Sequence, residues 1–137
     1  MEVVIDSNVL FRTIISRGDI VNVIFDPSLF LFAPEKLREE FVKHRNEILD
    51  KTELSEKEFN ELVKEAFERI KFVPLNEYKH CIPKAKALLK EHIKDEDFVA
   101  LSLSKNCKFW TYESLMFKLG IAISTKELSL ALREELP

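Results

Sequence analysis

The stretch Val3-Val4-Ile5-Asp6 opens the chain with three β-branched residues followed by an acid. Three apolar residues are too few for a helix, and their continuous apolarity is typical of a strand buried on both faces of a parallel sheet. Asp6 ends the run. The sequence therefore predicts an acidic side chain at the carboxyl end of a buried strand.

Beyond this stretch, short strand-like runs alternate with segments of helical apolar spacing. Strands are predicted over residues 29–32, 72–73, 109–111 and 121–123. Helices are predicted over 9–15, 20–25, 34–49, 55–70, 82–89 and 95–104, and after Ser124. Such alternation favours a parallel sheet with helices on both faces, a doubly wound α/β fold in three layers with a helical hairpin after the second strand.

Two helix starts carry a specific local signal. Ser55 with Glu58, and Ser124 with Glu127, have the spacing of capping boxes, in which each side chain satisfies the other residue's backbone N–H. From the first box an apolar stripe at helical spacing continues as far as Ile70. We therefore expect a helix from Ser55 to Ile70, and another after Ser124.

Length and composition restrict the functions that need to be considered. The 137 residues suit a single domain over 1–137, and only two glycines occur, so a glycine-rich phosphate loop is excluded. The formal charge of −3 gives no global argument for nucleic-acid binding. Cys81 and Cys107 lie in no Cys/His cluster, which argues against zinc and disulfides. We expect a soluble, cytoplasmic protein without a membrane segment.

Acids stand where ligands bind to parallel sheets, outside the carboxyl ends of the strands. Asp6 and Glu113 follow the first and fourth predicted strands, Asp95 begins the helix before the fourth, and Glu39 and Glu40 begin the helix after the second. Converging carboxylates repel unless a cation lies among them, and oxygen ligands alone favour Mg²⁺ or Mn²⁺. Phosphodiester hydrolysis is the matching reaction.

Other interpretations of the same acids remain open on local grounds. Asp6 and Asp95 could each be the N-cap of the following helix, and Glu113 could be a first-turn acid favoured by the helix dipole. Arg12, Arg17, Lys43, His44 and Arg45 could contact phosphates or could belong to solvated helix faces. The leucine-rich face of the last helix could form a dimer surface, through Leu128, Leu130, Ala131 and Leu132.

Four blocks of sequence resemble the motifs of PIN domains, in the same order. Residues 5–10, IDSNVL, resemble their D-x-N-V-L opening, and residues 34–41, PEKLREEF, resemble the helix that presents a Glu after the second strand. Residues 95–103, DEDFVALSL, are similar to D-x-x-F-x-A-L-A-L, and residues 109–113, FWTYE, are similar to I-W-T-x-D. The resemblance covers most of the chain.

This resemblance implies a metal-dependent endoribonuclease, acting mostly on single-stranded RNA and often dimeric. Many small stand-alone members are the toxins of toxin–antitoxin pairs, so an antitoxin protein is an implied partner. Carried over residue by residue, Asp6, Asp95 and Glu40 would hold Mg²⁺ or Mn²⁺, and Glu113 would be the fourth catalytic acid. Asn8 would orient the acidic cluster.

The chain departs from the family pattern at two positions. Glu113 stands where Asp is usual, and Leu115 stands where a further acid is often found. The second acid is also ambiguous, because Glu39 and Glu40 point about 100° apart on a helix. Glu40 is preferred, since it directly precedes the apolar Phe41 as the family's acid does.

Two other classes of function are compatible with acids at strand ends. The first is a catalytically inactive PIN-like module that binds RNA or protein, which the residues Glu113 and Leu115 favour. The second is a phosphotransfer enzyme or receiver-like domain, in which a second Asp usually stands at the position of Asn8. Asn8 counts against this second class.

Overall fold

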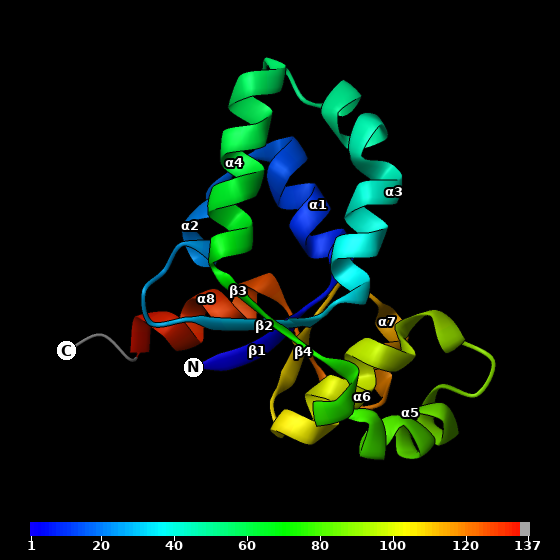
Figure 1. Ribbon diagram of the computed structural model, residues 1–137. Helices are drawn as coiled ribbons and strands as arrows, with labels where there is room; N and C mark the ends of the chain where they lie inside the picture. Colours follow the sequence, from blue (N-terminus) through cyan, green and yellow to red (C-terminus); the bar gives the residue numbers. More distant parts are fainter. Residues whose placement is uncertain (135–137) are drawn as a thin grey trace.

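The centre of the protein is a parallel sheet, shown in a computed structural model that describes residues 1–134 (Figure 1). Within these residues its order is β3-β2-β1-β4-β5, and every neighbouring pair is parallel. The strands are β1 (Glu2–Ile5), β2 (Phe30–Pro34), β3 (Ile70–Val73), β4 (Lys108–Trp110) and β5 (Ala122–Ile123).

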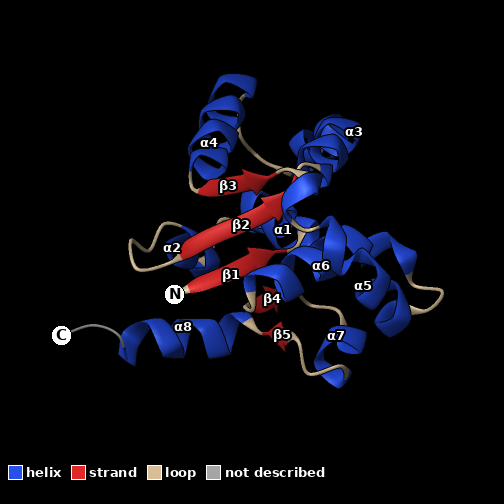
Figure 2. Cartoon of the chain, turned by 60° about the horizontal axis from the view of Figure 1, so that its bottom comes forward, coloured by secondary structure: helices blue, strands red, loops and turns tan. Residues whose placement is uncertain are grey.

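Helices cover both faces of this sheet. One layer holds α1 (Ser7–Ser16) and α2 (Asp19–Ile24), which connect β1 to β2, and the hairpin of α3 (Lys36–Lys51) and α4 (Glu56–Glu68), which connects β2 to β3. The opposite layer holds α5 (Ile82–Leu89) and α6 (Glu96–Lys105), which lead to β4 (Figure 2). After β4 follow α7 (Ser114–Lys118), β5 and α8 (Thr125–Glu134). Three short 3-10 helices precede α5 and α6, at Leu75–Glu77, Lys79–Cys81 and Ile93–Asp95.

The strand order confirms the predicted doubly wound α/β fold with its helical hairpin. From β1 the chain moves outward through β2 to β3, and then crosses back to β4 and β5 on the other side of β1. The order reverses between β1 and β4, where ligands bind in such sheets. A receiver-like domain has the order 2-1-3-4-5 instead. The observed order therefore excludes the receiver-like interpretation.

Both predicted capping boxes are confirmed by hydrogen bonds between Ser55 and Glu58 and between Ser124 and Glu127. The predicted end of the helix at Ile70 is wrong, because α4 ends at Glu68 and Ile70 is the first residue of β3. Ile70 is buried and pairs with Leu31. Ile70 enters the core from a strand, but its position in the sequence also continues the apolar stripe of α4. Periodicity alone therefore misplaced the end of the helix.

The central strands are buried as the apolar runs predict. Val3, Val4 and Ile5 are fully buried, and so is Trp110, whose indole N–H donates to the Thr125 hydroxyl at 3.0 Å. These residues form the middle of one hydrophobic core between the two helical layers. No helix among residues 1–134 combines the length and the apolar character needed to cross a bilayer.

Two of the four residues that the sequence suggested as a dimer surface on α8 are buried in the single chain. Leu128 and Leu132 are buried in the core of the single chain, and only Leu130 is strongly exposed. The helix packs against α2. Leu128 and Leu132 are therefore not available to a second copy.

Arg69 joins the end of α4 to the loop before β2. Its guanidinium donates to the backbone carbonyls of Ile24, Asp26 and Leu29 at 3.3, 2.7 and 3.0 Å. Hydrogen bonds from a charged donor are stronger than neutral ones, and partly buried carbonyls lose free energy when they are left unpaired. The guanidinium therefore holds the hairpin and the first β–α–β unit together.

Replacing Arg69 by Met is expected to lower the free energy of unfolding by about 2–4 kcal/mol, because three carbonyls lose a charged donor. Urea unfolding monitored by circular dichroism measures this change. The variant Arg69→Lys should lose part of the same stability, and Lys71→Met, an exposed neighbour, should lose under about 0.5 kcal/mol. A loss for Arg69→Met no larger than that of Lys71→Met would contradict the structural role.

Candidate active site

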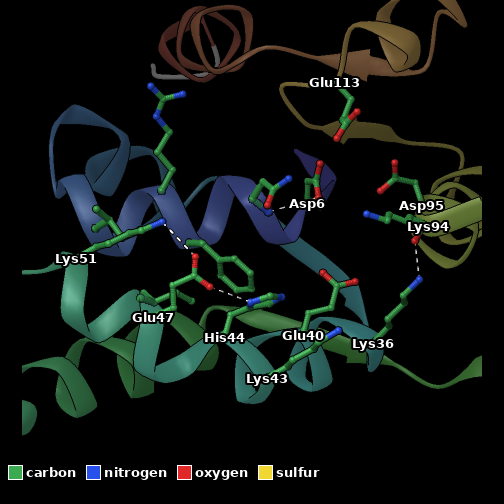
Figure 3. Close-up of a pocket in the computed structure, with 15 residues that line it drawn as sticks. Asp6, Lys36, Glu40, Lys43, His44, Glu47, Lys51, Lys94, Asp95 and Glu113 are labelled. Atoms are coloured by element: carbon green, nitrogen blue, oxygen red, sulfur yellow. Dashed lines mark hydrogen bonds and ion pairs between the residues drawn. The ribbon is translucent and has the colours of Figure 1, made fainter. Parts of the chain in front are cut away.

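A cleft of about 660 Å³ opens at the carboxyl ends of β1 and β4, with α1 and α3 as its walls (Figure 3). It lies at the point where the strand order reverses. Acidic, basic and apolar side chains share its lining. The lining residues are Asp6, Asn8, Phe11, Arg12, Ile15, Lys36, Glu40, Lys43, His44, Glu47, Ile48, Lys51, Lys94, Asp95 and Glu113.

Asp6 stands at the base of the cleft, where the buried strand β1 turns into α1. It is only 4% exposed, and its backbone N–H donates to the Trp110 carbonyl of β4 at 3.0 Å. As the N-cap of α1, its carboxylate accepts the backbone N–H of Asn8 at 3.5 Å. The Asp6 side chain thus caps α1 and also lies in the cleft.

Thr111 is the functional residue that sequence reasoning missed. It follows β4 directly, is fully buried, and its hydroxyl donates to Asp6 Oδ2 at 2.6 Å. The same hydroxyl oxygen accepts the backbone N–H of Glu113 at 3.1 Å. Thr111 therefore orients the Asp6 carboxylate and connects it to the backbone of Glu113. Its place in the FWTYE block was the available signal.

Asp95 and Glu113 occupy N-cap positions, of α6 and α7, without acting as caps. Neither side chain accepts a capping hydrogen bond from its helix in the described part of the chain. Both carboxylates line the cleft and lie at the same end of it as Asp6 (Figure 3). For these two acids the structure favours a place in the cleft over local capping.

The helix α3 presents Glu40, and not Glu39, to the cleft. Glu40 is half-buried and lines the cleft, whereas Glu39 is exposed and does not line it. Leu115, at the position of the missing further acid, is partly buried and packs against the core. The structure thus brings the predicted residues Asp6, Glu40, Asp95 and Glu113 to one cleft.

The four acids repel one another. Burial, followed by the charges of Asp95 and Glu113, raises the pKa of Asp6 from 3.8 to about 7, even though its hydrogen bond from Thr111 acts in the opposite direction. The pKa of Asp95 is also raised, first by burial and then by the charge of Glu113, while the ammonium of Lys36 lowers it. A positive charge that neutralises these carboxylates is therefore favoured at this end of the cleft.

The chemistry of these donors fits a hard divalent cation. Carboxylate oxygens are the ligands that such ions prefer, and a cation would relieve the repulsion that raises the pKa of Asp6. Among residues 1–134, no three His, Cys, Asp or Glu side chains are arranged to hold one ion. Mg²⁺ usually keeps several of its waters and is bound directly by one or two carboxylates, so a site for it does not need three acids in direct contact.

The predicted orienting residue, Asn8, lies at the mouth of the cleft. Its backbone N–H contacts Asp6, and its exposed side chain lines the cleft without a hydrogen bond to an acid in the described residues. The shorter bond to Asp6 comes from the Thr111 hydroxyl. Orientation of the Asp6 carboxylate thus comes from a backbone N–H and from Thr111.

The candidate phosphate-binding residues separate into two groups. Arg12, Lys43 and His44 line the cleft, whereas Arg17 and Arg45 do not. The Arg45 guanidinium instead bridges to α4, where it donates to Asn60 and Glu56. The cleft also contains three lysines that the sequence did not single out, Lys36, Lys51 and Lys94.

Fold and cleft together define an α/β protein with an acid-lined site at the switch point of a parallel sheet. Residues 4–133 match the PIN domain family, and the chain belongs to that family. PIN domains are generally nucleases and typically use divalent metal ions. No curated protein matches this chain.

Replacing Thr111 by Val keeps the shape of the side chain and removes its hydroxyl. The pKa of Asp6 is expected to rise by about one pH unit, because the hydrogen bond that favours the ionised carboxylate is lost. NMR titration of the side-chain carboxyl carbon measures this shift. The matched control is Thr13→Val, which removes a buried hydroxyl that donates to the Val9 carbonyl in α1. An unchanged titration in Thr111→Val would refute the assigned role.

Proposed function

We propose that this protein is an endoribonuclease that uses Mg²⁺ or Mn²⁺ to hydrolyse single-stranded RNA in the cleft between α1 and α3. The observation that carries the proposal is the convergence of Asp6, Glu40, Asp95 and Glu113 on one end of that cleft. These acids come from four separate parts of the chain. Membership of the PIN domain family supports the same reaction class.

Each acid has a distinct role in this proposal. Asp6 and Asp95 would hold the ion directly, and Glu40 would hold it through water or replace one of them. Glu113, whose side chain is one methylene longer than the usual Asp, would contact the ion's water. Thr111 keeps the Asp6 carboxylate turned toward the cleft. When bound, the ion supplies an activated water and neutralises charge on the phosphate.

The remainder of the cleft supports RNA as the substrate. Lys51 lies three turns of α3 beyond Glu40, or about 16 Å at about 1.5 Å per residue. Arg12, Lys43 and Lys51 also line the cleft, and so does Glu47, which accepts hydrogen bonds from His44 and Lys51. A backbone of phosphates would contact these cations while one phosphodiester reaches the acids. These basic side chains gather in the cleft although the formal charge of the whole chain is −3.

The cellular role belongs to the same proposal. We propose a toxin that is held inactive by an antitoxin protein and that assembles as a homodimer, in a reducing cytoplasm where Cys81 and Cys107 stay free thiols. Growth arrest on expression of the chain, relieved by Asp6→Asn, would support this role. Normal growth at full expression of the active enzyme would count against it.

One observation favours a second candidate function, a catalytically inactive module that binds RNA or protein. No three acids among residues 1–134 are arranged to hold one ion, and Glu113 stands where the family has Asp. In that case the basic side chains of the cleft would bind RNA, and the RNA would not be cleaved. Binding without turnover separates the two functions.

The test is cleavage of an end-labelled single-stranded RNA, followed by gel electrophoresis with Mn²⁺, with Mg²⁺ and with excess chelator. We expect cleavage with either ion and none with chelator. A 2′-deoxy nucleotide at the cleaved position should still be cut, because water and not the 2′-hydroxyl is the nucleophile. RNA that is retained but never cut, at any concentration of either ion, would favour the inactive module.

A further inference from the structure

Lys36 connects the two sides of the cleft near its acidic end. Its ammonium Nζ donates to the backbone carbonyl of Lys94 at 2.5 Å, between residues that are 58 positions apart in the chain (Figure 3). Lys36 is the first residue of α3, and Lys94 belongs to the short 3-10 helix before α6. The hydrogen bond therefore joins two elements that carry different acids of the site.

The segment that carries Asp95 has little packing of its own. Residues 91–94 are all exposed, and the segment follows Lys90, whose φ of 55° lies in the left-handed region. Asp95 occupies the N-cap position of α6 without a capping hydrogen bond from its side chain. An exposed segment with few contacts opens locally at low free energy. The bond from Lys36 restrains it at the residue adjacent to Asp95.

The same helix face carries Lys36 and Glu40. The two residues are four positions apart on α3, so their side chains are neighbours on one face, and both line the cleft. The bond from Lys36 to the Lys94 carbonyl therefore links the segment of Asp95 to the helix face that carries Glu40.

We propose that Lys36 is a positioning residue that ties the segment of Asp95 to α3 and so holds Asp95 beside Glu40 for a shared divalent cation. This inference rests on the proposed function, since the cation belongs to it. Lys36 itself would not contact the ion. Hydrogen-bond partners that orient metal ligands affect metal affinity by about 10- to 100-fold.

A purely electrostatic role for Lys36 would have the opposite effect on metal binding. The ammonium lies close enough to Asp95 to lower its pKa, so its charge repels a cation at the same site. Removing the charge alone would therefore strengthen the binding of Mn²⁺. Removing the tie would weaken it, because Asp95 would no longer be held in place. The sign of the change separates the two roles.

The experiment measures Mn²⁺ affinity by isothermal titration calorimetry, without RNA, for the wild type, Lys36→Met, Lys36→Arg and Lys57→Met. Lys57 is an exposed lysine in the first turn of α4 and does not line the cleft. We expect Lys36→Met to bind Mn²⁺ about tenfold more weakly. Lys36→Arg, which keeps a donor of similar reach, should restore most of the affinity, and Lys57→Met should match the wild type. Equal or tighter binding by Lys36→Met would overturn the proposal.

Hydrogen exchange separates failure of this inference from failure of the proposed function. In the absence of metal, Lys36→Met should speed amide exchange over Ile93–Asp95, while Lys57→Met leaves it unchanged. If the wild type binds no Mn²⁺, the proposed function fails, and the inference fails with it even if exchange shows a structural tie. If the wild type binds Mn²⁺ but exchange over Ile93–Asp95 is the same in both variants, only the role of Lys36 is refuted.

Discussion

Asp6→Asn is expected to reduce metal-dependent cleavage of single-stranded RNA by about 100- to 1000-fold, the range for removing one charged or hydrogen-bonding group that acts on the transition state. Asp6 is the most buried of the four acids and lies where β1 ends. Asparagine preserves its size and can still accept from Thr111, so the loss reports the missing charge. Initial rates over a range of Mn²⁺ concentrations measure the effect.

The matched control for this variant is Asp19→Asn, which removes an exposed acid from the first turn of α2, outside the cleft. It should keep the wild-type rate of cleavage. Circular dichroism should show that both variants are folded at the assay temperature. Equal rates for the wild type and Asp6→Asn at every Mn²⁺ concentration would refute the assignment of Asp6 and, with it, the nuclease mechanism.

The same substitution is expected to stabilise the metal-free protein above pH 7, by up to about 4 kcal/mol in the free energy of unfolding. The pKa of Asp6 is about 7 in the folded chain and 3.8 as the ordinary value. Between these two values the folded state binds the proton that the unfolded state has released. Stability of the wild type therefore falls as the pH rises through this window, and then stays at the lower value.

Urea unfolding in excess chelator, between pH 4 and pH 8, measures the difference between the wild type and Asp6→Asn. The difference should be small at pH 4, where Asp6 is protonated in the folded state and only about half ionised in the unfolded state, and should reach its maximum above pH 7. Asp95, whose pKa is also raised, changes the stability of both proteins in the same direction. A difference independent of pH would contradict the raised pKa of Asp6.

Together the two expected results describe one acidic site. The Asp6 carboxylate destabilises the metal-free protein, and a cation that binds to it would restore the lost stability. Adding Mn²⁺ at pH 8 should therefore stabilise the wild type more than Asp6→Asn. This comparison needs no RNA and so does not depend on the choice of substrate.

Much of the fold could be predicted because it depends on local pattern. The capping boxes at Ser55 and Ser124 involve residues three positions apart, and both form as predicted. The prediction failed at Ile70, where strand and helix both send the side chain into the core. It also failed on Leu128 and Leu132 of α8, since a buried apolar residue looks the same in the sequence whether its own chain or a second copy covers it.

The candidate site was less accessible to sequence reasoning. Motif order indicated Asp6, Asp95 and Glu113, and the following Phe41 favoured Glu40 over Glu39. The orientation of α3 against the sheet places Glu40, and not Glu39, in the lining of the cleft. Nothing local marks Lys36 as a partner of the Lys94 carbonyl, because a surface lysine at the start of a helix is ordinary. The polar contacts of the cleft join residues that are far apart in the chain, so no periodic pattern in the sequence predicts them.

By itself the sequence determined the alternation of strands and helices, the burial of β1 and the acid at its end, because each follows from apolar spacing along a few neighbouring residues. Only the tertiary structure decided which acids share a cleft and what orients them. The bond from Thr111 to Asp6 spans 105 positions of the chain. It exists because β1 and β4 lie side by side in the sheet, and that pairing is a product of packing the whole core.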